Sequence, residues 1–173
     1  MAIMSNYLLE DEITALATRV VEENSKAGRQ VATAESCTGG LVAGALTEIA
    51  GSSAVLDRGF VTYSNEAKME SLGVAQDIIE TFGAVSVACV WAMAQGALER
   101  SNADVAVAVS GVAGPGGGTQ LKPVGTVVFA RATRGSEGEP EGELKHFEGG
   151  DGPEGRASIR RQATLCALEL LLP

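Results

Sequence analysis

A short segment that unites a serine, a cysteine and two glycines has the composition of a catalytic turn. The segment AESCTGG occupies residues 34–40, with an apolar run on each side. Ser36 and Thr38 are residue types that cap helix N-termini, and Gly39 and Gly40 let a ligand approach the backbone. A strand-to-helix turn directs amides and the positive end of the helix dipole at one spot. Ser36 would stand there, beside an anion or a developing oxyanion.

A serine nucleophile needs a base, and Lys68 is a better candidate than the one histidine. Lys68 lies one helical turn after Tyr63 and Asn65, just beyond a predicted strand. Ligands of open α/β sheets bind at such strand ends, and a desolvated lysine can take the proton of a serine. On spacing alone, however, Lys68 is interpreted as an ordinary solvated helix lysine, and only the family resemblance given below favours the base. His146 lies on a predicted edge strand and is interpreted as a surface histidine.

Two neighbours of Ser36 offer alternative chemistry. Cys37 shares the predicted helix N-terminus, where the pKa of a thiol falls, so it is a rival nucleophile. Cys37 could equally be a small core residue. Glu35 could act as an acid, or it could be a carboxylate placed near the start of a helix.

Two further features suggest an anionic ligand. The glycine-rich loop 111–118 leads to Lys122 and another strand, so it is neither a dinucleotide fingerprint nor a Walker loop. It is either flexible or a backbone that approaches a ligand. Arg156 and Arg160 are four residues apart on a predicted helix and so point the same way. They would form a phosphate or carboxylate clamp, or a solvated pair near Glu154.

The composition limits the class of protein. The chain has 173 residues, 45% of them apolar and 4% aromatic, and a net charge of −9 without a Lys/Arg run. This balance argues against nucleic-acid binding, although a small phosphate ligand needs only two or three local cations. No apolar run of about 18 residues and no basic-then-apolar N-terminus occurs, so we expect a soluble cytoplasmic protein without membrane contact. Three distant cysteines suggest reduced thiols rather than disulfides or zinc.

Hydrophobic periodicity predicts alternating helices and strands. We expect helices over 11–24, 41–49, 64–73, 76–82, 87–98 and 153–172, and strands over 31–34, 55–63, 104–110, 124–131 and 144–147. The acidic, glycine-rich segment 135–142 is predicted to be a mobile turn. No helix separates the last three strands, so some must be antiparallel neighbours. The prediction is an α/β fold, a three-layer sandwich with a mixed sheet.

Five segments together resemble one family, the CinA-like C-terminal domain of competence/damage-inducible proteins, which includes nicotinamide-nucleotide amidases. The match runs in order from about Val31 to the C-terminus, and its segments are residues 34–40, 59–68, 83–86, 111–117 and 122–125. The resemblance implies one α/β/α domain over residues 1–173, of the stand-alone form, around a mostly parallel five-stranded sheet. It also implies hydrolysis of nicotinamide mononucleotide to nicotinate mononucleotide and ammonia, for pyridine nucleotide recycling, without a metal or cofactor.

By the same resemblance, Ser36 is the nucleophile, Lys68 is its base and the later proton donor to ammonia, and Tyr63 orients this dyad. The resemblance also implies a set of substrate-binding residues. N–H groups near Thr38, Gly39 and Gly40, with Gly111, would hold the oxyanion; Arg156 and Arg160 would take the phosphate; Glu35 and Asn65 complete the set.

One departure from the family pattern concerns the phosphate site. The family has a compact Gly-Asp-Arg before its last helix, whereas here residues 152–155 separate Gly150-Asp151 from Arg156. Two rival functions stay open: a nucleotide-binding or regulatory module without turnover, and a partner-binding protein in competence or the DNA damage response. The small-residue helix faces are compatible with a homodimer.

Overall fold

The fold is built on a five-stranded sheet. The computed structural model describes residues 6–138, 140–149 and 152–173. The strands, in the spatial order β2-β1-β3-β4-β5, are β2 (Leu56–Val61), β1 (Val31–Glu35), β3 (Val105–Gly111), β4 (Thr126–Thr133) and β5 (Glu141–His146). β1 pairs with β2 and β3 in parallel, whereas β4 is antiparallel to β3 and β5. The predicted mixed sheet is confirmed, but the expectation that it is mostly parallel is not, because parallel and antiparallel pairs are equal in number.

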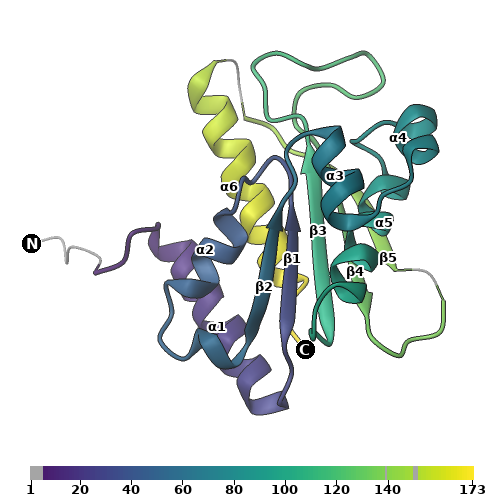
Figure 1. Ribbon diagram of the computed structural model, residues 1–173. Coiled ribbons are helices and arrows are strands. Elements are labelled where there is room, and N and C mark those ends of the chain that lie inside the picture. Colours follow the sequence, from purple (N-terminus) through teal and green to yellow (C-terminus); the bar gives the residue numbers. More distant parts are fainter. Residues whose placement is uncertain (1–5, 139, 150–151) are drawn as a thin grey trace, which may run out of the picture.

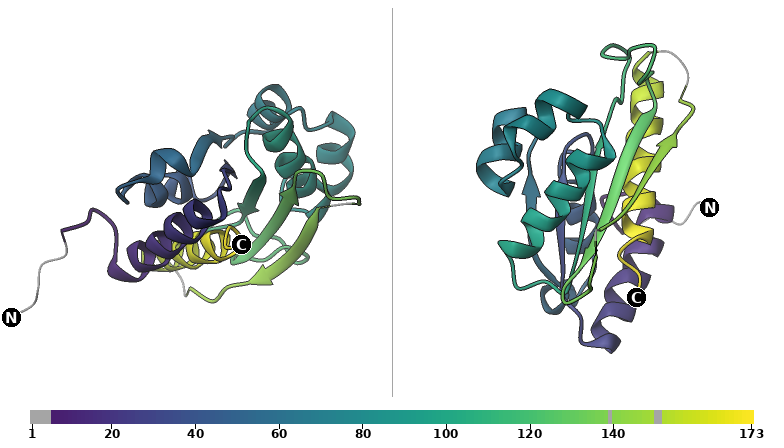
Figure 2. Two further views of the ribbon diagram at one scale, coloured as in Figure 1. Left: turned by 90° about the horizontal axis from the view of Figure 1, so that it is seen from below. Right: turned by 90° about the vertical axis from the view of Figure 1, so that its right-hand side faces the viewer.

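Helices cover both faces of the sheet, which confirms the three layers (Figures 1 and 2). One face carries α1 (Asp11–Ala27), α2 (Leu41–Thr47) and α6 (Pro153–Glu169). The other carries α3 (Asn65–Leu72), α4 (Gln76–Phe82) and α5 (Val87–Glu99), and a short 3₁₀ turn (Ser52–Ala54) precedes β2. Each face therefore encloses its own hydrophobic core.

Alternation along the central strands explains the two cores. In β3, Val105, Val107 and Val109 face α1, α2 and α6, whereas Ala106 and Ala108 face α5. Successive side chains of a strand point to opposite faces, and small alanines let a helix lie close to the sheet. The same alternation in β1 places the side chains of successive residues at its carboxyl end on opposite faces of the sheet.

The predicted elements are all present, no predicted boundary is wrong by more than three residues, and one of the three-residue shifts is at the start of β5. This strand begins at Glu141 rather than at residue 144, because Glu141 and Gly142 pair with Arg131 and Ala130 of β4. Glutamate and glycine have low strand propensity, so the pattern gave no signal there. Gly142 lies against Trp91 of α5, where a Cβ would collide with the indole. The predicted turn 135–142 is accordingly shorter, and its residue 139 lies outside the described residues.

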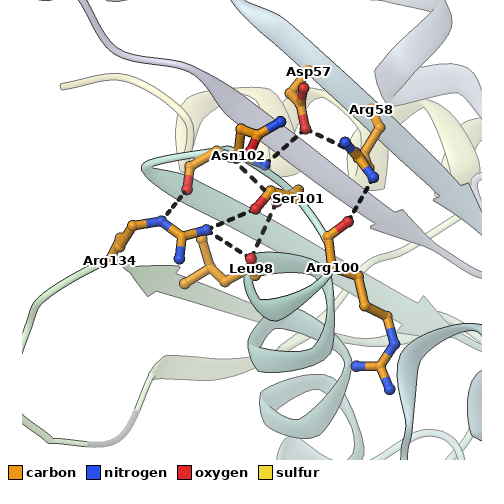
Figure 3. Close-up of polar contacts among 8 residues, drawn as sticks. Asp57, Arg58, Leu98, Arg100, Ser101, Asn102 and Arg134 are labelled. Carbon is orange, nitrogen blue, oxygen red and sulfur yellow. Dashed lines mark hydrogen bonds and ion pairs between the residues drawn. The ribbon is translucent and has the colours of Figure 1, made fainter.

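A polar network closes the end of the sheet at which the parallel strands begin (Figure 3). Arg134 donates to the carbonyls of Leu98, Ser101 and Ala103, at 2.7–3.0 Å, and so satisfies backbone groups at the end of α5. Asp57 accepts from Arg58 and from the N–H of Asn102. At this end of the sheet, Arg134 therefore stabilises the fold by binding backbone carbonyls.

Some general features bear on function. In the described part of the chain, no helix is long and apolar enough to cross a membrane, and no group of three or more His, Cys, Asp or Glu side chains could hold a metal ion. The three cysteines, Cys37, Cys89 and Cys166, are buried and free.

Candidate active site

A pocket of about 280 Å³ opens at the carboxyl ends of β1 and β3. The first turn of α3 and the loop that follows β3 form its walls. Its basic lining residues are Lys68 and Arg156, and no carboxylate of the described residues lines it; the others are Ser36, Cys37, Tyr63, Asn65, Ala84, Val85, Ser110, Gly111, Val112, Ala113, Gly114, Gly116 and Gly117. In a chain of net charge −9, this pocket is a local site of positive charge.

Glu35, the last residue of β1, is turned away from the pocket. It is fully buried, and its carboxylate accepts from Thr38 Oγ1 at 2.6 Å and from the N–H groups of Gly40, Val42 and Ala43 at 3.2, 2.9 and 3.1 Å. These amides are the unpaired donors of the first turn of α2. Glu35 therefore caps α2, so the predictions that it is an acid or contacts substrate are not supported. The predicted caps, the Ser36 and Thr38 side chains, do not bind these amides.

The amides expected to hold an oxyanion are mostly occupied. The N–H of Gly39 donates to the carbonyl of Ser36 at 3.0 Å, and that of Gly40 donates to Glu35. Neither glycine lines the pocket, and Thr38 is fully buried with its hydroxyl on Glu35. In this conformation Gly39 and Gly40 are not oxyanion donors. Gly111 does line the pocket, as expected.

Lys68 meets Ser36 on the face of the sheet opposite Glu35. Its Nζ lies 3.0 Å from Ser36 Oγ and donates to the carbonyl of Thr62 at 2.7 Å, with Tyr63 O at 3.5 Å. Lys68 is 1% exposed. Burial lowers the pKa of its ammonium, although the nearby Cys89 and Cys37 oppose the shift. A buried amine without a carboxylate partner favours the neutral form, which can accept the proton of a serine.

The local sequence explains why Lys68 reaches the interior. Ser64 begins α3 by accepting from the N–H of Ala67 at 3.0 Å, immediately after β2, so Lys68 lies in the first turns. α3 then packs closely on α5, since Gly96 leaves room for the carbonyl of Leu72, where a Cβ would collide. Lys68 thereby lies between the sheet and α5.

Tyr63 and Arg156 lie together at the mouth of the pocket. The Tyr63 side chain is 63% exposed, and its hydroxyl accepts from Arg156 Nη2 at 3.2 Å. Arg156 Nη1 donates to the carbonyl of Gly114 at 2.7 Å. Among the described residues, Tyr63 contacts the Ser36–Lys68 pair only through its carbonyl. The exposed Asn65 lines the pocket nearby, as predicted.

Arg160 and Arg156 bind different parts of the chain. Its Nε donates to the carbonyl of Cys37 at 3.0 Å and its Nη2 to that of Thr38 at 3.4 Å. Arg160 does not line the pocket, whereas Arg156 does. The predicted clamp of two arginines is therefore not formed. Residues 150 and 151, the Gly-Asp of the expected motif, lie outside the described residues.

Cys37 and His146 are poor candidates for chemistry. Burial raises the pKa of the Cys37 thiol to about 11. The predicted lowering of this pKa at a helix N-terminus is wrong, because burial dominates, and the Glu35 carboxylate, which occupies amides of that helix, adds to the increase. His146 is exposed at the end of β5 and does not line the pocket.

Two contributors to the site were missed from the sequence. Ser110 is buried and lines the pocket at the end of β3, and a polar residue closing an apolar central strand was the available signal. The carbonyl of Thr62, which accepts from Lys68, has no signal in the sequence because every residue carries one.

Comparisons with known proteins agree on one family. The family model "CinA C-terminal domain" matches residues 13–173. The nicotinamide-nucleotide amidohydrolase PncC of Escherichia coli is 49% identical over 95% of both chains. A CinA-like protein of Akkermansia muciniphila is also 49% identical, over 96% of this chain, which spans only 38% of that longer relative.

Solved structures give the same result. The crystal structure of competence/damage inducible protein CihA from Agrobacterium tumefaciens has a TM-score of 0.85 and 51% identity, covering 95% of this chain and 96% of that one. A CinA superfamily structure from Escherichia coli has a TM-score of 0.84 at 35% identity, with 97% and 94% covered. By sequence and by fold, the chain belongs to the CinA C-terminal domain family.

Proposed function

We propose that the protein hydrolyses the carboxamide of nicotinamide mononucleotide to nicotinate mononucleotide and ammonia. The observation that carries the proposal is the 3.0 Å contact between Ser36 Oγ and a buried lysine amine, in a pocket that no carboxylate of the described part of the chain lines. The name of the E. coli relative, a nicotinamide-nucleotide amidohydrolase aligned over 95% of both chains, supports the substrate. A single domain over the chain is proposed with it.

The reaction follows from a serine and a neutral lysine. Lys68 takes the proton of Ser36 Oγ as this oxygen attacks the carboxamide carbon, and it then gives a proton to the leaving nitrogen. Ammonia departs, and the acyl group remains bound to Ser36 Oγ as an ester. A water molecule, deprotonated by Lys68, attacks this ester and releases the carboxylate, while Ser36 regains its proton. Both half-reactions use the same pair of atoms.

The tetrahedral intermediate needs a donor for its oxyanion. We assign this role to the N–H of Cys37, because it follows the nucleophile directly and Cys37 lines the pocket. Loss of one such donor typically costs about 10²–10³ in kcat. Gly111 also lines the pocket.

The phosphate is assigned to Arg156. Its guanidinium uses two donors on Gly114 and Tyr63 and lines the pocket, so further donors are available to an anion. The Tyr63 hydroxyl beside it could donate to the same phosphate. A charge-assisted contact of this kind contributes about 1.5–3 kcal/mol to binding.

The test is ammonia release by the purified protein from nicotinamide mononucleotide, with Ser36→Ala in parallel. We expect release by the wild type and none by the variant, and much lower kcat/KM for nicotinamide riboside, which lacks the phosphate. Binding of the mononucleotide without ammonia release would contradict the proposal and favour a regulatory nucleotide-binding module. Full activity of Ser36→Ala would exclude Ser36 as nucleophile.

A further inference from the structure

Arg160 reaches the catalytic turn from behind. It lies on α6, which packs against α2 (Figure 1), and its guanidinium binds the carbonyls of the two residues that follow Ser36. Gly39 lies beside this guanidinium, since a Cβ there would be in ordinary van der Waals contact with Arg160 Nη2, at 3.5 Å. A cation is thus held against the turn on the side away from the pocket.

These contacts fix consecutive peptide planes. A trans peptide is planar, so a carbonyl held in one direction holds the next N–H in the opposite direction. Nε of Arg160 fixes the Cys37–Thr38 peptide through its carbonyl, and Nη2 fixes the Thr38–Gly39 peptide. The N–H of this second peptide donates to Ser36 O at 3.0 Å. That bond in turn fixes the Ser36–Cys37 peptide, which carries the N–H assigned to the oxyanion.

We propose that Arg160 is a positioning residue for the hydrolysis: it holds the turn that carries Ser36 and the Cys37 N–H in the geometry of the transition state. This assignment rests on the proposed amidase function. Arg160 acts through the backbone and does not touch the substrate. A donor displaced from the oxyanion loses interactions made chiefly in the transition state, so kcat falls while KM changes little.

The two arginines of α6 provide a direct contrast. Arg156 lines the pocket, so its loss removes binding that is present in the ground state and raises KM. Within the described part of the chain, the side chain of Arg160 donates to two carbonyls, and both belong to the turn. The next residue, Arg161, is ion-paired with Glu10 and Glu12 at the surface and supplies a matched control on the same helix.

The experiment compares Arg160→Gln, Arg160→Lys, Arg156→Gln and Arg161→Gln with the wild type. Steady-state ammonia release gives kcat and KM, calorimetry gives the affinity for nicotinate mononucleotide, and thermal unfolding shows that each variant is folded at the assay temperature. Arg160→Gln should lower kcat by about 10- to 100-fold, which is less than the 10²–10³ typical for complete loss of an oxyanion donor because the Cys37 N–H is displaced rather than removed. KM and product affinity should stay within about threefold of the wild type. Arg160→Lys keeps the charge but loses the planar guanidinium that donates to two carbonyls at once, so its kcat should lie between those of Arg160→Gln and the wild type. Arg161→Gln should match the wild type.

Each other outcome decides against a stated claim. Unchanged kcat in Arg160→Gln, or a rise in KM like that of Arg156→Gln, would overturn the positioning role. A wild type that releases no ammonia would overturn the proposed function instead. In that case the calorimetric comparison still separates the arginines: product affinity weakened equally by Arg160→Gln and Arg156→Gln would make Arg160 a ligand contact.

Discussion

Glu35 and Lys68 are both ionisable and almost fully buried, yet their surroundings differ completely. Glu35 accepts four hydrogen bonds, three of them from amides at the start of α2, and is closed off from the pocket. Lys68 lies in the pocket wall with a hydroxyl and two carbonyls within reach, and none of the described carboxylates pairs with it. The Glu35 carboxylate has enough hydrogen-bond donors to be stabilised as an anion, whereas the Lys68 ammonium has no counter-charge among the described residues.

The contrast separates stability from chemistry. A buried charge with enough donors stabilises the charged form, whereas a buried cation without a counter-charge favours loss of its proton. Glu35 therefore holds the turn, and burial lowers the pKa of Lys68, which makes this side chain the candidate base. Strand alternation produces the difference, because Glu35 and Ser36 leave β1 on opposite faces.

The largest expected effect is on activity, from Lys68→Met. Without the base, kcat/KM for nicotinamide mononucleotide should fall by about 10³-fold or more. The fold should persist, since an apolar side chain of similar length suits a buried site. An active Lys68→Met variant would show that another group takes the proton.

The same variant has a stability signature with a definite sign. The pKa of Lys68 is lower in the folded than in the unfolded chain, so the unfolded chain binds more protons at this group. The free energy of unfolding of the wild type therefore rises with pH between the lowered pKa and the ordinary lysine pKa. Lys68→Met should thus be at least as stable as the wild type at pH 7, and its advantage should shrink as the pH rises. Denaturant unfolding at several pH values measures this, and the opposite slope would contradict the lowered pKa.

A smaller effect on activity but the largest on stability is expected from Glu35→Gln. The variant loses the charge that satisfies the first turn of α2, which we expect to cost about 3 kcal/mol of unfolding free energy. For a chain of this size, Tm would fall by about 6–12 °C. Glu70→Gln, on the exposed side of α3, is the control and should shift Tm little. Equal Tm values for the two variants would contradict the capping role.

The smallest effect is expected from Cys37→Ala. Because burial raises the pKa of this thiol to about 11, it stays protonated at neutral pH and is not the nucleophile. We expect kcat/KM within about tenfold of the wild type, the loss reflecting packing in the turn. Complete loss of ammonia release by a folded Cys37→Ala variant would return Cys37 to the catalytic role.

Most of the fold could be predicted from local pattern, because its elements are strongly periodic or have clear ends. Gly28, in the left-handed conformation at φ 63°, ends α1 as its residue type indicates. The extra residues of β5 were missed because a strand at the sheet edge, containing Glu141 and Gly142, is formed by pairing with β4 rather than by its own propensity.

The site was predictable in its residue types and less so in their partners. The segment around Ser36 and the helix of Lys68 could be recognised, although their 3.0 Å contact depends on tertiary packing of α3 against α5. Arg156 and Arg160 share a helix face in sequence, yet the turn after Ser36 supplies carbonyls to only one of them. Which acceptors a side chain meets across the fold is not encoded in spacing along the chain.

The most direct test of the account is a titration of Lys68 itself. NMR of protein with isotope-labelled lysine side chains, assigned by the signal missing in Lys68→Met, follows its amine as the pH is raised. We expect Lys68 to lose its proton well before the other lysines, with kcat/KM for ammonia release rising over the same pH range as the base becomes neutral. A Lys68 that titrates together with the surface lysines would contradict the neutral base on which the proposed mechanism depends.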